Sequence, residues 1–285
     1  MNRTARAAMA QQTVAILEGG SYTSLDGVHV RIQDDLRNCV EATRLFWPED
    51  LKMHLVKVLA EPGTAVPTLV EIENETTLSG IARLLRAGCA TVGALNFASA
   101  KNPGGGFLSG SQAQEESLAR SSGLYPSLMK AWDFYERHRK EASPLYSDAM
   151  ILSPGCPIFR DDTGALLSGV RHATFISSAA PNAGALSHNA PQDLTLVPDV
   201  LRRRAEYVLA LAASQGLRDI VLGAWGCGVF RNDPQLVART FMELLARPEW
   251  QGRFSKVVFS ILDPSPNADL VETFRAAAAQ CGLGG

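Results

Sequence analysis

The sequence predicts an α/β domain organised around a buried, largely parallel sheet. In its last third, helices at 198–214, 233–246 and 267–279 alternate with apolar strands at 219–224 and 256–262. Alternation at this spacing is typical of βαβ units, in which parallel strands are covered on both faces. Ligands of such sheets bind where loops leave the carboxyl ends of the strands. Those loops are therefore the first place to search for function.

The first part of the chain is less regular. Thr4 to Leu17 predicts a helix that stops at Gly19 and Gly20, and a short hairpin is expected within residues 22–31. A helical patch over 38–45 is broken by Pro48. We expect residues 1–65 to form a mainly helical extension, packed on one core domain that spans residues 66–285.

Regular alternation begins after Pro67. β-branched and apolar runs favour strands, and a one-sided apolar pattern followed by glycine favours a helix. The elements expected here are a strand at 68–72, a helix at 77–87, a strand at 91–97, a helix at 125–140, and short strands at 149–152, 158–160 and 174–178.

The segment from Leu95 to Leu124 organises the rest of the chain. The apolar strand breaks at Asn102-Pro103, three glycines follow (Gly104, Gly105 and Gly106), and Ser111 with Gln114 resembles a capping box. Consecutive glycines indicate positive φ angles or a close approach to the backbone. A strand, a glycine loop and a helix N-terminus together favour anion binding. A simple tight turn explains the glycines alone equally well.

Two adjacent acids, Glu115 and Glu116, follow in the first turn of that helix. They could merely complement the helix dipole, which is worth about 0.3–1 kcal/mol. Carboxyl groups are also suited to general acid/base catalysis. Because consecutive helical residues point about 100° apart, only one of the pair can face a reacting bond squarely.

A second glycine loop follows the strand at 219–224, in the sequence GAWGCGVF. By itself it could be a structural turn, and packing is a simpler role for its cysteine than nucleophilic attack. Two such loops could instead grip a pyrophosphate from opposite sides. The first loop matches neither the dinucleotide-binding G-x-G-x-x-G pattern nor a Walker A motif.

Composition excludes several classes of function. A net charge of −2 over 285 residues gives no basic footprint for direct DNA binding. The five cysteines are widely spaced and the five histidines lack metal-ligand spacing, so we expect reduced thiols and no metal or other cofactor. Neither a signal peptide nor a membrane span is evident, which favours a soluble cytoplasmic protein. Arg202, Arg203 and Arg204 are most simply a solvated helix face.

Three glycines, seven residues and then Gln-Glu-Glu form a specific signature. Together with NFASAKNPGGGFLSGSQAQEE, the later GAWGCGVF and the Gly-Gly-Ser-Tyr after the first helix, it resembles the bacterial, microbial-type poly(ADP-ribose) glycohydrolases. The resemblance implies a three-layer α/β/α macrodomain with a mixed, largely parallel sheet and an N-terminal helical extension. It also implies hydrolysis of the ribose–ribose O-glycosidic bond of poly(ADP-ribose), in the reversal of ADP-ribosylation during the DNA damage response.

The resemblance also implies roles for individual residues. Glu116 would be the catalytic acid/base, Glu115 would orient the scissile ribose, and Gln114 would support the pair. Adenine recognition would fall near Glu73 or Asn74. The other residues expected to bind the ligand are Asn96, Ser99, Gly104, Gly105, Gly106, Gly226, Cys227, Gly228, Val229 and Phe230, with Phe230 on the terminal ribose.

The expected partners are poly(ADP-ribose), ADP-ribose and ADP-ribosylated proteins, with a monomeric enzyme acting from chain ends. Two alternatives stay open. One is a non-hydrolysing ADP-ribose-binding macrodomain, and the other is a hydrolase of protein-linked mono-ADP-ribose. A pure binding module would not need the pair of glutamates.

Overall fold

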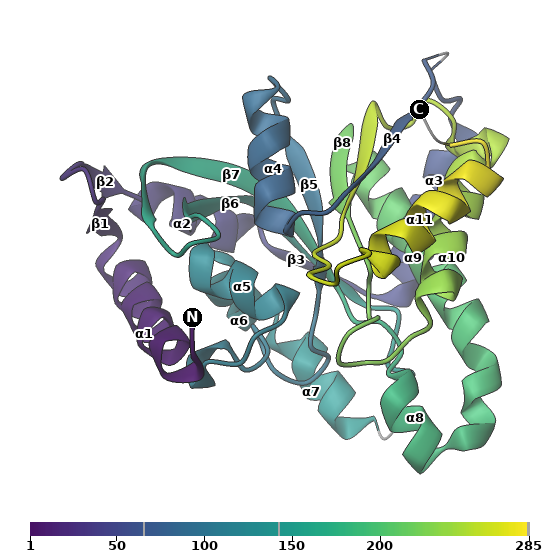
Figure 1. Cartoon of the computed structure of the whole chain (residues 1–285), viewed down its shortest axis with the longest axis horizontal. Coiled ribbons are helices and arrows are strands. Elements are labelled where there is room, and N and C mark those ends of the chain that lie inside the picture. The colour runs from purple at the N-terminus through teal and green to yellow at the C-terminus, as the bar shows by residue number, and fades with distance from the viewer. Residues whose placement is uncertain (65, 142, 284–285) are drawn as a thin grey trace.

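A seven-stranded mixed sheet forms the centre of the protein (Figure 1). The computed structural model describes residues 1–64, 66–141 and 143–283. In spatial order the strands are β3 (Arg44–Phe46), β6 (Met150–Arg160), β7 (Leu166–Ser178), β5 (Val92–Phe97), β8 (Asp219–Leu222), β9 (Lys256–Ser260) and β4 (Leu69–Glu73). The predicted fold class is confirmed.

Strand direction decides which loops meet. The five strands from β7 to β4 are parallel. Strand β6 runs antiparallel to its two neighbours, β7 and the edge strand β3. The strands β5 and β8 are neighbours in the middle of the sheet. Both predicted glycine loops therefore follow adjacent parallel strands and lie at the carboxyl ends of those strands.

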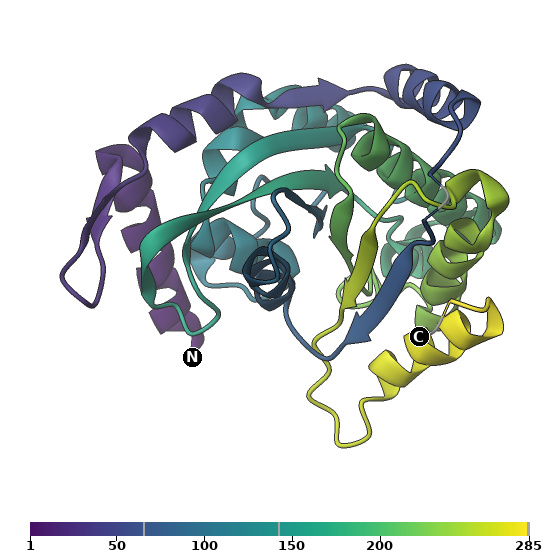
Figure 2. The ribbon, with the colours of Figure 1, turned by 90° about the horizontal axis from the view of Figure 1, so that it is seen from above.

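Helices cover both faces of the sheet. Strands β9 and β4 lie between α4 on one side and α10 and α11 on the other (Figure 2). Buried residues alternate accordingly, since Ile220 and Leu222 of β8 face one apolar cluster and Val221 faces the other. The helices are α1 (Arg3–Gly19), α2 (Gln33–Ala42), α3 (Pro48–Ala60), α4 (Thr77–Arg86), α5 (Gln114–Ser121), α6 (Leu124–Lys130), α7 (Trp132–Lys140), α8 (Ala183–Asn189), α9 (Val197–Ser214), α10 (Pro234–Ala246) and α11 (Asp269–Gln280), with short 3₁₀ helices η1 (Phe107–Ser109), η2 (Pro191–Leu196) and η3 (Pro248–Trp250).

Helix α1 and the strands β1 (Ser21–Thr23) and β2 (His29–Arg31) lie at one end of the molecule, whereas α3 lies toward the other end, near α9 and α11 (Figure 1). Helix α1 and the hairpin of β1 and β2 have the predicted form. Strand β3, which was not predicted, joins the central sheet, so the N-terminal segment supplies an edge strand as well as helices. The predicted boundary at residue 65 lies outside the described residues.

Pro48 begins a helix instead of breaking the chain. It occupies the first turn of α3, where a missing N–H costs no helical hydrogen bond. The Trp47 N–H donates to the Asp50 carboxylate at 2.9 Å and closes that end of the helix. The helical patch expected over 38–45 was wrong in its bounds, because α2 ends at Ala42 and residues 44–46 form β3. The interpretation of Pro48 as a helix breaker was also wrong, since it begins a helix.

Two further predictions differ in length. The helix expected over 125–140 is two helices, α6 and α7, which meet at Ala131 (φ −93°, ψ 41°). The short strands at 149–152 and 158–160 are one strand, β6, whose register with β7 shifts between Ser153 and Cys156. This irregularity contains Pro154, which accords with the preference of proline for bulges. Within the described residues, no helix is both long and apolar enough to cross a membrane.

Candidate active site

The first glycine loop turns sharply after β5. Gly104 and Gly105 have φ angles of 68° and 60°, as the glycine run predicted. The Gly105 N–H donates to the Asn102 carbonyl at 2.9 Å and closes the turn. The chain then passes through η1 and enters α5 at Gln114.

Gln114 joins the start of α5 to β5. Its side-chain oxygen accepts from the Phe97 N–H at 2.9 Å, and its amide nitrogen donates to the Leu95 carbonyl at 2.8 Å and to the Thr77 hydroxyl at 3.1 Å. The predicted capping box between Ser111 and Gln114 was wrong. Ala113 precedes the helix without a side-chain cap, since the strand backbone takes the hydrogen bonds of Gln114.

Glu115 points into the protein and is 2% exposed. Its carboxyl oxygens accept from the Ser99 N–H at 2.7 Å and from the Asn96 amide at 3.2 Å. Burial raises the pKa of Glu115 to about 8, although the hydrogen bonds from Ser99 and Asn96 favour the ionised form. Glu116 adds to the increase through like-charge repulsion. Near neutral pH the protonated form of Glu115 therefore predominates.

Asn96 lies behind Glu115 and is fully buried. Its amide nitrogen also donates to the Ser177 hydroxyl at 2.9 Å, and its carbonyl oxygen has no partner among the described residues. The Ser99 hydroxyl accepts from the Asn102 N–H at 3.2 Å at the start of the glycine loop. Both residues predicted to bind ligand are thus part of the frame around Glu115.

Glu116 turns toward the glycine loop and is only partly buried. Its carboxylate accepts from the Gly106 N–H at 3.0 Å. A Cβ atom on Gly105 would collide with a carboxylate oxygen of Glu116 and lie 2.9 Å from its Cδ. In this arrangement the Glu116 carboxylate occupies the space that a side chain at residue 105 would fill. The two glutamates face different surroundings, as helical geometry predicted.

The second glycine loop is stabilised from beneath. Gly226 has φ 73°, and the buried Asn232 donates to its carbonyl at 3.2 Å and to the Pro181 carbonyl at 2.8 Å. The fully buried Trp225 donates to the Ser178 carbonyl at 3.0 Å. Gly228 has open space around it, and Val229 is 77% exposed at the tip of the loop.

Cys227 and Phe230 complete this loop. Burial raises the pKa of the Cys227 thiol to about 12, so the group stays protonated, as expected for a packing residue. The Phe230 ring lies 6.0 Å from the ring of Tyr146, centroid to centroid. Tyr146 takes a positive φ of 59°, which is uncommon for a residue with a side chain.

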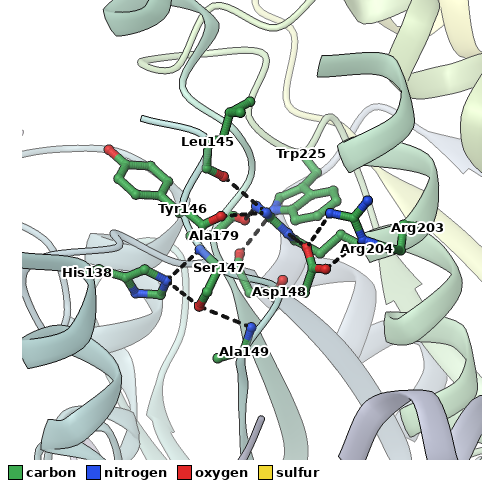
Figure 3. A network of polar contacts seen from close by, with 11 residues as sticks. His138, Leu145, Tyr146, Ser147, Asp148, Ala149, Ala179, Arg203, Arg204 and Trp225 are labelled. Carbon is green, nitrogen blue, oxygen red and sulfur yellow. Dashed lines mark hydrogen bonds and ion pairs between the residues drawn. The ribbon is translucent and has the colours of Figure 1, made fainter. Parts of the chain in front are cut away.

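A buried ion pair holds the segment that carries Tyr146 (Figure 3). Arg204 of α9 is fully buried, and it donates to the Asp148 carboxylate at 2.9 Å. It also donates to the Ala179, Leu145 and Tyr146 carbonyls. Although burial opposes ionisation, Arg203 and Arg204 keep the pKa of Asp148 below its usual value. The interpretation of residues 202–204 as a solvated face was wrong for Arg204.

His138 fixes the other side of the same segment. Its Nε2 accepts from the Ser147 N–H at 3.0 Å and lies 2.7 Å from the Ser147 hydroxyl (Figure 3). Burial lowers the pKa of His138 to about 4, so the ring is neutral near pH 7. The neutral ring can accept the Ser147 N–H.

The residues predicted near adenine lie at the far edge of the sheet. Glu73 ends β4 and is exposed, and Asn74 follows it. The Asn74 amide donates to the Asp263 carbonyl at 2.8 Å and accepts from the Asp263 N–H at 3.0 Å. The Asn74 side chain thus joins the loops after β4 and β9.

Several residues of the site were not predicted from the sequence. Tyr146 and Arg204 lie far from the glycine motifs along the chain, whereas Asn232 directly follows the second loop. The Asn-Asp-Pro that follows the second loop was interpreted only as a helix start. In the described part of the chain, no cluster of three or more histidine, cysteine, aspartate or glutamate side chains is suited to hold a metal ion.

Comparison with known proteins identifies the family. Residues 10–161 match the family described as microbial-type PARG, catalytic domain. The poly(ADP-ribose) glycohydrolase from Thermomonospora curvata is 47% identical and superposes with a TM-score of 0.92, over 96% of this chain and 100% of that one. Its complex with the inhibitor ADP-HPD is 46% identical with a TM-score of 0.89, over 96% and 99% of the two chains.

A second bacterial enzyme is also similar. The poly(ADP-ribose) glycohydrolase from Deinococcus radiodurans, in complex with ADP-ribose, is 45% identical with a TM-score of 0.81, over 86% of this chain and 97% of that one. A search of curated proteins found no match.

Replacing Asp148 with alanine would leave the Arg204 guanidinium buried without a counter-charge. Loss of one partner of a buried ion pair costs about 3–5 kcal/mol, and we expect a decrease of that size in the free energy of unfolding by urea. The matched control is Arg203→Ala, since Arg203 binds the same carboxylate but its side chain is 47% exposed. The control is expected to lose about 1 kcal/mol or less. Equal losses in the two variants would contradict this account.

The raised pKa of Glu115 makes stability depend on pH. Because its pKa is about 8 in the folded protein and 4.5 ordinarily, the neutral carboxyl stabilises the fold fully below pH 4.5. That contribution falls by up to about 1.4 kcal/mol per pH unit and is lost as the pH rises through about 8. Urea unfolding of wild type and Glu115→Gln between pH 4.5 and pH 9 should show this loss only in wild type. Parallel pH profiles would argue against a buried neutral Glu115.

Proposed function

The chain belongs to the microbial-type poly(ADP-ribose) glycohydrolase family, and from that premise we propose that it releases ADP-ribose from polymer ends with Glu116 as its general acid/base. As a poly(ADP-ribose) glycohydrolase it is a glycosidase. The observation that carries the proposed role of Glu116 is the difference between two adjacent glutamates. Glu115 is buried and accepts hydrogen bonds from Asn96 and Ser99. Glu116 is partly exposed and accepts one hydrogen bond from the glycine loop.

In the proposed reaction, Glu116 starts as the neutral acid. It donates its proton to the ribose oxygen that leaves with the rest of the polymer, and the bond from that oxygen to the anomeric carbon breaks. The electron pair of the bond goes to the leaving oxygen, and positive charge develops on the terminal ribose. The Glu116 carboxylate then takes a proton from the water that attacks the anomeric carbon. The free terminal ADP-ribose is the product.

The glycine loop would hold the pyrophosphate of the substrate. In the free protein the Gly106 N–H donates to the Glu116 carboxylate. We infer that a bound pyrophosphate takes N–H groups of the glycine loop, with Gly226 to Val229 on its other side. The same loop would then position both the pyrophosphate and Glu116.

Glu115 would orient the terminal ribose. Asn96 and Ser99 hold its carboxyl group, and its rotation is restricted by burial. A group held in this way can bind a ribose hydroxyl without reorganisation, which is the advantage of a preorganised site. Phe230 would pack on the same ribose, supported by Tyr146. ADP-ribose complexes of the Deinococcus radiodurans enzyme support binding of the same ligand here.

We expect Glu116→Gln to abolish most ADP-ribose release from purified polymer. General acid/base catalysis contributes about 10²–10⁴-fold, and the rate should fall by at least that factor. ADP-ribose affinity, measured by calorimetry, should change little. The control variant is Glu136→Gln, which changes an exposed glutamate on α7.

Release of oligomers before ADP-ribose would contradict action from chain ends. Wild-type activity only on mono-ADP-ribosylated protein would favour the alternative hydrolase.

Gly105→Ala tests whether the loop and Glu116 must touch. The added Cβ would meet the Glu116 carboxylate, so we expect ADP-ribose release to fall at least 10²-fold. Gly155→Ala is the matched control, because Gly155 also has a positive φ (54°) but nothing lies near its missing side chain. Both variants should lose about 1 kcal/mol of stability from backbone strain. If Gly105→Ala retains wild-type turnover, the loop does not constrain Glu116.

A further inference from the structure

An aromatic side chain is exposed beside the catalytic loop. Trp132, at the start of α7, is 40% exposed. The guanidinium carbon of Arg139 lies 4.6 Å from its ring centroid, so the arginine covers the indole. Arg139 also donates to the Asn102 side-chain oxygen at 3.3 Å. Trp132 and Arg139 thus form a stack, and Arg139 connects the stack to the residue where the glycine loop begins.

The stack borders the catalytic pair from two directions. On the loop side, Asn102 accepts from the Gly105 N–H, and the next glycine binds Glu116. On the helix side, Tyr135 lies one turn after Trp132, with 6.3 Å between ring centroids. Burial and then the charge of Glu115 raise the pKa of Tyr135, whose buried hydroxyl has no hydrogen-bond partner among the described residues. A substrate group that extends past Glu116 on this side meets the stack.

The strand order and the predicted position of the adenine together suggest a direction for the polymer. The predicted adenine contacts follow β4 at one edge of the sheet, and the glutamates follow β5 nearer the middle. Helix α7 contacts the segment before β6, toward the other edge, through His138 and Ser147. A terminal ADP-ribose that runs from β4 to β5 therefore directs its glycosidic bond toward α7. The preceding unit of the polymer must leave the site on that side.

We propose that Trp132 and Arg139 form a binding subsite for the penultimate ADP-ribose unit, whose adenosine carries the leaving oxygen. This inference rests on the proposed function. The leaving oxygen belongs to the ribose that bears the adenine, so the purine lies one nucleoside length from Glu116. Its flat face can stack on the guanidinium of Arg139, which already stacks on the indole. The exposed Lys101, next to Asn102, adds positive charge for the diphosphate.

This subsite would give poly(ADP-ribose) a higher affinity than the product, free ADP-ribose. Free ADP-ribose fills only the terminal site, whereas polymer would also fill the stack. Base stacking on an aromatic side chain contributes about 1–3 kcal/mol, equivalent to about 5- to 150-fold in affinity. A surface cation–π pair with a merely structural role would affect both ligands alike. The ratio of the two affinities is therefore the diagnostic quantity.

The experiment measures dissociation constants for purified poly(ADP-ribose) and for ADP-ribose in a Glu116→Gln background, where polymer is not cleaved. Trp132→Ala and Arg139→Ala should each weaken polymer binding about 5- to 150-fold and change ADP-ribose binding less than 2-fold. Trp132→Phe should retain most of the polymer affinity. Lys140→Gln is the control, because it removes a neighbouring exposed positive charge outside the stack.

Three results would overturn the subsite: unchanged polymer affinity in both alanine variants, parallel losses for polymer and ADP-ribose, or no preference of the parent protein for polymer. Failure of the proposed function has a different signature, namely no release of ADP-ribose by the wild type. A selective loss of polymer affinity in Trp132→Ala would support the subsite even in that case.

Discussion

The side chain of Gln114 joins the C-terminal end of β5 to the first turn of α5. Its hydrogen bonds to Leu95 and Phe97 determine where the helix begins and how it is rotated about its axis. The directions of the next two residues follow from that rotation, so one glutamate is buried against Asn96 and Ser99 and the other faces the glycine loop. A shift of the helix by one residue would bring Gln114 or Ser117 into one of these two environments and leave a glutamate in only the other.

The second loop depends on a different kind of support. Two side chains, Asn232 and Trp225, support it from positions within or just after the loop. They tie the loop to the backbone after β7, and Arg204 ties that backbone to the segment around Tyr146. The floor beneath the loop is thus a buried polar network in which the charge of Arg204 is balanced by Asp148. The Asn232 carbonyl oxygen has no partner among the described residues, but the hydrogen bonds that Asn232, Trp225 and Arg204 donate hold the backbone beneath the loop.

The parts of the structure that could be predicted from sequence were those with a local signal. The strand at β5, the glycine turn with positive φ and the position of both loops at strand ends follow from periodicity and glycine placement, whereas the adjacency of the two strands is seen only in the sheet order. Local patterns failed where a residue had two roles. Ser111 and Gln114 matched a capping box, but tertiary hydrogen bonds took the glutamine. Arg204 matched a charged surface, but its partner Asp148 is 56 residues away and no local pattern connects the two.

Helix α1 lies against the back of the catalytic loop. Arg6 donates to the Gly110 carbonyl at 2.8 Å, Arg3 to the Ser109 carbonyl at 3.0 Å, and Thr13 to the Arg120 carbonyl at 2.6 Å. The backbone of α1 approaches Gly110 so closely that a side chain at this position would collide with the Arg3 carbonyl. The loop that bears Gly106 thus has a peripheral helix as one of its walls. Transient detachment of this helix, a low-energy local opening, would release the loop and Glu116 while the sheet stayed folded. Loss of catalytic competence would then precede global unfolding, and the lifetime of the active state would be determined at the N-terminal end of the protein.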